Sequence, residues 1–153
     1  MTISRRSDYA VRALVDMAAQ GDGGPYRVAE IARRQSVPMP FLAKIVQQLV
    51  AAGLLQTRRG KGGGVYLAAN ADSVTILDVV QAIDGPLDLN WCTAEPRRCD
   101  RWQGCAVHPA WVSAQRLLEQ VLAEARITDL AQAQRRLDAA LAAQTAESGE
   151  ERT

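Results

Sequence analysis

The sequence is poor in the side chains that carry most enzyme chemistry and aromatic packing. It has one histidine, three cysteines and one phenylalanine, and with three tryptophans and three tyrosines only seven of its 153 residues are aromatic. A core with so few rings has to be built from Leu, Val, Ile and Ala, which favours helices. No Cys-x-x-Cys pair is present, and the sole histidine would have to serve as the base for a catalytic thiol, so we expect no enzyme.

Long apolar runs are also missing. No segment reaches the ~20 apolar residues of a membrane-spanning helix, and the opening MTISRRSDYAVRAL has no stretch typical of a signal peptide. These absences predict a cytoplasmic protein without a membrane partner. Thiols are normally reduced in that compartment, and three is an odd number, so a disulfide framework is not expected.

The net charge of +1 hides an uneven distribution. Residues 1–62 hold ten Arg or Lys and four Asp or Glu, a net +6, whereas residues 63–153 hold eight and thirteen, a net −5. This split predicts an anionic partner for the first part of the chain. The alternative is chance clustering of basic residues on a solvated surface.

Hydrophobic periodicity predicts three helices in the basic part, at about 5–19, 27–35 and 39–52. Gly53 stands where a helix-ending glycine is expected after the third. The third helix has an apolar stripe with the spacing of a buried face. The stripe consists of Leu42, Ile45, Val46, Leu49 and Val50.

Two β-prone runs, LLQTRR and VYLAA, flank the glycine-rich segment GKGGG and predict a hairpin with a basic tip. Three short helices followed by a basic hairpin is the order of elements in a winged helix-turn-helix. We therefore assign residues 1–84 to a DNA-binding domain of that type. The expected fold class is mainly α, with a small β-hairpin wing.

The third helix and the hairpin hold most of the residues expected to contact DNA. Lys44 and Gln47 suit base edges, because Lys pairs with guanine and Gln with adenine. Arg33, Arg34 and Lys61 suit phosphates, and the arginines of the hairpin suit a narrow minor groove. The alternative is a helical domain with a solvated basic face. The predicted DNA-contacting residues are Arg33, Pro40, Phe41, Lys44, Gln47, Arg58, Arg59 and Lys61.

A helix is predicted at about 75–84, where Thr75 and Asp78 resemble a capping box. Residues 85–108 have no periodicity and are expected to form a loop. A long helix from Pro109 to about residue 126 has a wide apolar stripe. Pairing with the same helix of a second chain would bury the stripe and give a homodimer that reads a palindromic site. The alternative is that this helix folds back on its own domain.

Residues 109–143 are accordingly assigned to a dimerisation helix and a C-terminal helix. The polar residues 144–153 are expected to form a disordered tail.

The loop at 85–108 holds all three cysteines and the only histidine. Cys92, Cys99 and Cys105 are spaced C-x6-C-x5-C, and His108 follows three residues after the last. Thiolates suit zinc or iron–sulfur clusters. Zinc sites usually use a closer C-x2-4-C pair, so the wider spacing on a loop favours a cluster with several metal corners. Histidine replaces cysteine on one iron of Rieske centres, which makes His108 a candidate fourth ligand.

Other interpretations of this segment stay open. The cysteines could be small buried side chains or redox nucleophiles. Trp91, Trp102 and Trp111 could form an apolar shell around a cluster, or they could only anchor the loop.

Six segments carry a resemblance to a known family. They are SDYAVRALVDMA (7–18), AEIARRQSVPMPFLAKIVQQLVAAGLL (29–55), RRGKGGGVYLA (58–68), TILDVVQAID (75–84), the three-cysteine segment and ITDLA (127–131). With them the chain resembles the dimeric bacterial winged-helix regulators that sense through an iron–sulfur cluster, the IscR-, NsrR- and RirA-like proteins.

This resemblance implies a homodimer with one cluster per subunit that regulates promoters. The family cysteines correspond to Cys92, Cys99 and Cys105. IscR-like members hold a [2Fe–2S] cluster with a histidine at the position of His108. NsrR-like members hold a [4Fe–4S] cluster with an aspartate of the partner subunit, at the position of Asp8. Both possible fourth ligands are therefore present.

We expect a cytoplasmic, homodimeric DNA-binding transcription regulator, a repressor. A bound iron–sulfur cluster is expected to control its operator affinity in response to iron or cluster status, nitric oxide or redox state. The alternative is a DNA-binding regulator that is stabilised by zinc or uses its cysteines as a metal-free thiol switch.

Overall fold

The first helix of the DNA-binding domain, α1 (Arg5–Gln20), confirms the helix predicted at 5–19 and has well-defined ends. The computed structural model describes residues 3–21, 23–69, 71–94 and 99–150. The hydroxyl of Ser4 accepts a hydrogen bond from the backbone N–H of Ser7 and caps the first turn. Gly21 ends the helix with a φ of 70°, a conformation that favours glycine.

The helix-turn-helix consists of α2 (Val28–Arg34) and α3 (Met39–Ala51). Both helices lie close to the predicted ranges. Gly53 follows α3 with a φ of 74°, as a helix-ending glycine does. The apolar stripe of α3 is buried as predicted, apart from Val50, which is half-buried against the core.

The wing is the predicted hairpin, formed by the antiparallel strands β1 (Leu55–Arg58) and β2 (Gly64–Leu67). Tyr26, in the segment before α2, anchors it. Its backbone N–H donates to the carbonyl of Val65 at 2.8 Å, and its carbonyl accepts from the N–H of Val65 at 2.9 Å. These bonds fix the wing beside the helix-turn-helix.

A short 3-10 helix, η1 (Ala71–Ser73), leads from the wing to α4 (Ile76–Asp84). The capping box predicted at the start of α4 is present. The N–H of Asp78 donates to the Thr75 hydroxyl at 3.2 Å, and the N–H of Thr75 donates to the Asp78 carboxylate at 2.8 Å. The shorter aspartate side chain thus replaces the usual glutamate.

The described residues of the segment predicted as a loop at 85–108 include two short helical turns. These are α5 (Trp91–Ala94) and the 3-10 helix η3 (Trp102–Gly104). Elements of three or four residues are too short to produce a detectable periodicity. Residues 95–98 of this segment lie outside the part of the chain that the structure describes.

Two long helices complete the chain, α6 (His108–Glu124) and α7 (Ile127–Glu150). The expected disordered tail does not hold for residues 144–150, which continue α7. The alanines at 139, 140, 142 and 143 explain the continuation, because alanine is the residue that best propagates a helix. Residues 151–153 lie outside the described part.

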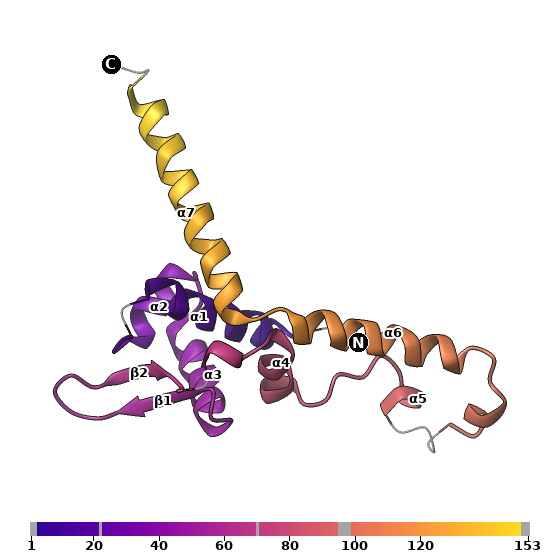
Figure 1. The fold of residues 1–153 in the computed structure, drawn as a ribbon. Helices are drawn as coiled ribbons and strands as arrows, with labels where there is room; N and C mark the ends of the chain where they lie inside the picture. The colour runs from indigo at the N-terminus through magenta and orange to yellow at the C-terminus, as the bar shows by residue number, and fades with distance from the viewer. Residues whose placement is uncertain (1–2, 22, 70, 95–98, 151–153) are drawn as a thin grey trace.

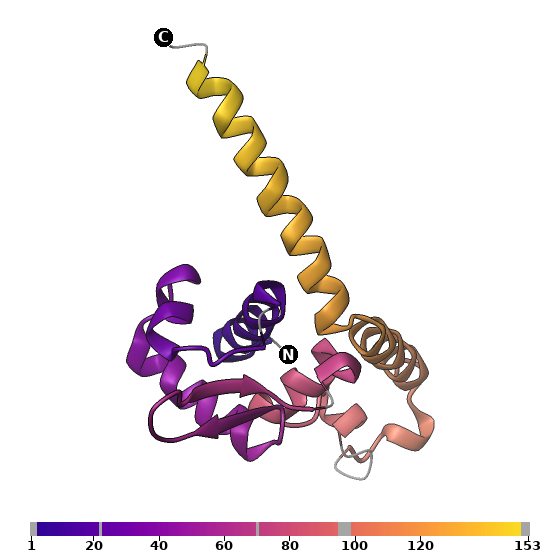
Figure 2. The ribbon, with the colours of Figure 1, turned by 60° about the vertical axis from the view of Figure 1, so that its left-hand side comes forward.

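The elements form a helical body from which α6 and α7 project in different directions (Figures 1 and 2). The start of α7 packs on α1, and α4 packs on α1, α3 and α6. The segment that holds the three cysteines, residues 85–107, is called the cysteine segment. Its described parts lie beside α6 and at the end of α6 that is farthest from the wing (Figure 1). Among the described residues, no helix combines the length and apolar content that crossing a membrane requires.

Candidate nucleic-acid interface and cysteine segment

The helix α3 buries its apolar stripe and leaves its polar side free. Pro40, Phe41, Lys44 and Gln47, which the sequence predicted as DNA contacts, are all exposed. Phe41 also packs edge-on against Tyr9 of α1, with ring centroids 5.9 Å apart. The four residues form a surface able to enter a major groove, and their contact with bases stays a prediction.

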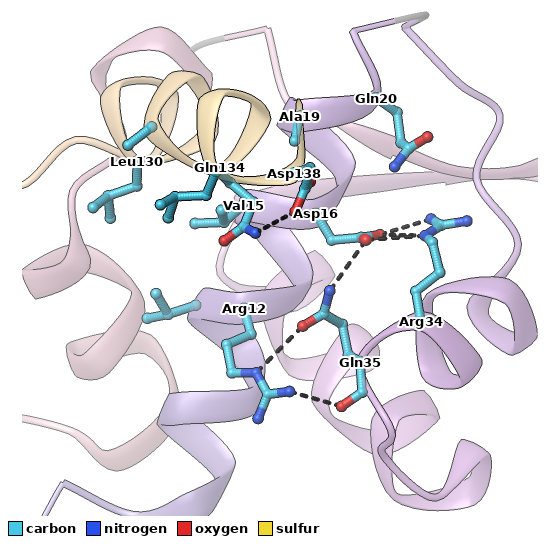
Figure 3. A pocket seen from close by; sticks show the side chains of 13 residues that line it. Arg12, Val15, Asp16, Ala19, Gln20, Arg34, Gln35, Leu130, Gln134 and Asp138 are labelled. Atoms are coloured by element: carbon cyan, nitrogen blue, oxygen red, sulfur yellow. Dashed lines mark hydrogen bonds and ion pairs between the residues drawn. The ribbon is translucent and has the colours of Figure 1, made fainter. Parts of the chain in front are cut away.

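The adjacent arginines of α2 have different surroundings. Arg33 is exposed and keeps its predicted role as a phosphate contact. Arg34 is turned instead toward the buried carboxylate of Asp16 on α1, with one nitrogen 2.6 Å from Oδ2 and Nε 2.9 Å from Oδ1 (Figure 3). This bidentate pair fixes α2 to α1, so the prediction that Arg34 contacts phosphate is not supported.

The same network extends to the turn after α2. Gln35 donates to Asp16 at 3.1 Å, and Arg12 donates to the backbone carbonyl of Gln35 at 2.8 Å (Figure 3). These bonds form one wall of an open cavity of about 670 Å³ between α1, the end of α2 and α7. The orientation of the helix-turn-helix is therefore set by polar contacts as well as by its apolar core.

The wing presents its basic tip to solvent. Arg59 and Lys61 are exposed, while the guanidinium of Arg58 lies over the ring of Tyr66, 4.6 Å from its centroid. A Cβ at Gly63 would lie 2.5 Å from the carbonyl oxygen of Arg58, which explains glycine at that position. The contacts of Arg58, Arg59 and Lys61 with DNA stay predictions.

A polar cluster at the start of α1 had no signal in the sequence, because its members are about 80 positions apart. Asp84, the last residue of α4, accepts hydrogen bonds from the hydroxyls of Ser4 at 2.7 Å and Ser7 at 2.6 Å. It also accepts from the backbone N–H of Ser4 at 3.1 Å. On the same turn, Arg6 donates to Gln48 of α3 at 2.6 Å. The first turn of α1 is thus bonded to both α4 and α3.

Asp8, one of the two rival cluster ligands, lies on this same turn. Its carboxylate is 57% exposed and forms an ion pair with Arg12 at 3.7 Å. An exposed pair at this distance holds the carboxylate only weakly, so Asp8 is accessible from outside the subunit.

The three cysteines lie on separate pieces of the segment. Cys92 is in α5, Cys99 precedes η3 and Cys105 follows it, and all three are half-buried free thiols. Within the described residues, no three or more His, Cys, Asp or Glu side chains are grouped as metal ligands would be. The structure therefore does not bring the predicted ligands together.

His108 begins α6 and is half-buried beside Trp102, with the two rings edge to face and their centroids 6.1 Å apart. Its Nδ1 is buried and has no hydrogen-bond partner among the described residues. A buried nitrogen without a partner is unfavourable unless something else satisfies it, such as a metal. Of the three tryptophans that could form an apolar shell, only Trp102 lies against His108 in this way. Trp91 is 77% exposed and Trp111 is 44% exposed.

Known proteins share this arrangement of elements. The family described as "Rrf2: Iron-dependent Transcriptional regulator" matches residues 3–133. The HTH-type transcriptional regulator IscR of Escherichia coli is 31% identical over 111 residues, which cover 72% of this chain and 68% of that protein.

Solved structures agree with this match. IscR of T. potens has a TM-score of 0.67 at 25% identity, and the alignment covers 85% of each chain. CymR, the global cysteine regulator of B. subtilis, has a TM-score of 0.67 at 24% identity over 86% of this chain and 97% of CymR, a likeness of fold alone. The winged-helix fold class predicted from the sequence is confirmed.

Proposed function

Because the chain belongs to the Rrf2 family of DNA-binding transcription regulators, with IscR among its relatives, we propose that a bound iron–sulfur cluster controls its affinity for DNA. The family consists of regulators, so the expectation of no enzyme is confirmed. The proposal extends to a cytoplasmic repressor that acts as a homodimer on a palindromic operator.

Cys92, Cys99 and Cys105 would hold the cluster, with His108 or Asp8 as the fourth ligand. The chemistry of these donors fits, since thiolates and imidazole both ligate iron. The observation that carries the proposal is the buried Nδ1 of His108, which lacks a hydrogen-bond partner among the described residues and lies three residues after Cys105. With His108 as fourth ligand the cluster is [2Fe–2S].

With Asp8 as fourth ligand the cluster is instead [4Fe–4S]. The exposure of Asp8 on α1 supports donation to the cluster of a second subunit. A bound cluster would supply an iron centre that is sensitive to iron supply, oxidation and nitric oxide.

The homodimer is supported by the apolar surface of α6. A helix that exposes several large apolar side chains gains stability by burying them against a partner. The residues involved are Trp111, Leu117 and Val121 of α6 and Val107 directly before it, which are 44–64% exposed.

The connection between the cysteine segment and the DNA-binding domain follows the chain. The segment starts directly after Asp84, whose carboxylate is bonded to Ser4 and Ser7 of α1. The helix α4 that ends at Asp84 also packs on α3. A change in the segment would therefore displace the first turn of α1 and the recognition helix α3 together.

A metal-free thiol switch or a zinc-stabilised regulator is the second candidate. The observation in favour of the thiol switch is that the three cysteines are free and are not grouped as metal ligands within the described residues; zinc would need the same convergence of ligands as a cluster. Iron and sulfide analysis of anaerobic protein separates these two from the cluster protein.

The proposed function is tested by operator binding of anaerobic protein with and without iron. The operator is first selected from a pool of random duplexes. A coupling of about 1–3 kcal/mol predicts affinities that differ roughly 5- to 150-fold between the two forms. Equal affinities would remove control by the cluster and leave DNA binding intact.

A further inference from the structure

An open groove runs beside the exposed face of α3, between it and the first turns of α1. It measures about 520 Å³ and has mostly apolar walls. It is lined by Arg5, Tyr9, Pro38, Pro40, Phe41 and Lys44. Half of this lining is predicted from the sequence to contact DNA, but Arg5 and Tyr9 come from α1, which carries no such prediction.

The side chains of α1 at this groove follow helical spacing. Arg5, Tyr9 and Arg12 are four and three positions apart, which puts them on one face of the helix. The ring of Tyr9 is held by Phe41 on one side and by the guanidinium of Arg12 at 5.7 Å. Arg12 is also bonded to Gln35. The phenol is therefore positioned by Phe41 of α3 and by Arg12, which is itself held by the residue that follows α2.

The basic groups at the groove are free to bind an anion. Arg5 and Lys44 are exposed, and neither side chain has a hydrogen bond or ion pair with a described residue. The carboxylate of Asp8 is the opposing charge on this turn, and Arg12 at 3.7 Å partly offsets it. Arg6 does not compete for the anion, because Gln48 occupies it.

We infer that this groove binds the phosphate backbone of the DNA strand that borders the major groove read by α3, with Arg5 and the Tyr9 hydroxyl as contacts. Phosphate contacts from groups beside a recognition helix fix its register and orientation on the duplex. Arg5 and Tyr9 of α1 lie beside Phe41 and Lys44 of α3 at this groove. The inference rests on the role of α3 as the recognition helix and does not depend on the cluster.

The test uses the iron-free protein and a duplex selected by the wild type from a random pool. Binding is measured by fluorescence anisotropy over a range of salt concentrations. Arg5→Ala is expected to weaken binding roughly 5-fold for each subunit at 0.15 M salt, and to reduce the log-log salt slope by about one for each subunit. Arg5→Lys should keep the slope.

Tyr9→Phe retains the ring packed against Phe41 and removes only the hydroxyl. We expect binding to weaken about 3- to 10-fold with an unchanged salt slope, because no charge is lost. The matched control is Arg136→Ala, an exposed arginine on α7, which projects away from the wing (Figure 1). It should change neither the affinity nor the slope beyond the general effect of one charge.

An unchanged slope in Arg5→Ala, with wild-type thermal unfolding, would overturn the phosphate contact and leave DNA binding by α3 in place. A weaker dimer with an unchanged slope would instead identify the groove as a subunit contact and equally overturn the inference. Failure of the wild type to enrich any duplex both with and without iron would overturn this inference and the proposed regulation together.

Discussion

The Asp84 carboxylate accepts a hydrogen bond from the Ser7 hydroxyl at 2.6 Å and thereby fastens the end of α4 to the first turn of α1. Burial acts to raise the pKa of Asp84. The hydrogen bonds from Ser7 and Ser4 and the nearby charge of Arg6 outweigh it, so the pKa lies below its ordinary value. The ionised carboxylate is therefore the form that stabilises the fold.

Asp84→Asn is expected to lower the free energy of unfolding at pH 7 by about 1 kcal/mol, because it weakens charge-assisted hydrogen bonds at a site open to solvent. A depressed pKa stabilises the fold above the unfolded-state value and ceases to do so as the pH falls through the folded-state value. The difference in unfolding free energy between the wild type and Asp84→Asn should therefore shrink below about pH 4. Urea unfolding at pH 7 and below pH 4 measures this difference.

The control for this prediction is Asp72→Asn, an exposed acid in η1. Its free energy of unfolding should match that of the wild type within about 0.5 kcal/mol, both at pH 7 and below about pH 4. If both asparagine variants lose the same stability, Asp84 has no special role in fastening α4 to α1.

Arg34 and Arg33 are adjacent in the sequence, but we expect opposite effects from replacing them. Arg34→Ala leaves the carboxylate of Asp16, which is 6% exposed, without its cation, and should cost about 2–4 kcal/mol of unfolding free energy. Arg33→Ala should cost less than about 0.5 kcal/mol and instead weaken DNA binding. Thermal unfolding and anisotropy on the same samples compare the two. Equal stability losses would refute the distinction.

A charge on the exposed apolar face of α6 should separate the subunits. Val121 is 62% exposed in one chain, and Val121→Glu would put two carboxylates into the interface of a dimer formed through α6. We expect a monomer in sedimentation velocity at micromolar concentration. Leu141→Glu, at an equally exposed position on α7, is the control and should remain dimeric. A dimeric Val121→Glu would show that the interface lies elsewhere.

Most of the DNA-binding domain could be predicted because its signals are local. The stripe of α3, the glycine after it and the capping box of α4 each involve residues within one or two helical turns, and each is confirmed. The glycine-rich hairpin is equally local, since a Cβ at Gly63 would collide with the backbone of Arg58.

The features that the sequence did not predict depend mostly on contacts between residues far apart in the chain. Nothing near Arg34 in the sequence indicates that Asp16, 18 positions earlier, will hold it. The link from Asp84 to Ser7 spans 77 positions. The polar composition of residues 144–150 predicts disorder, but α7 continues through them, because the preceding alanines favour a helix. The cysteine spacing indicates donors without fixing how they converge.

The fourth cluster ligand can be assigned by replacing each rival. If His108 is the ligand, His108→Ala should lose most of its cluster or convert it to a more labile form, while Asp8→Ala should keep the wild-type spectrum. If Asp8 is the ligand, the two results exchange. Visible absorption and iron content of anaerobic samples report the outcome. Wild-type clusters in both variants would exclude both residues.

Native mass spectrometry of protein isolated without oxygen tests most directly whether Cys92, Cys99 and Cys105 hold a cluster. We expect a coloured protein with the mass of two chains, in which each chain carries equal numbers of iron and sulfide ions. A colourless protein without iron or sulfide, after expression with ample iron, would contradict cluster binding and leave a DNA-binding regulator that senses by other means.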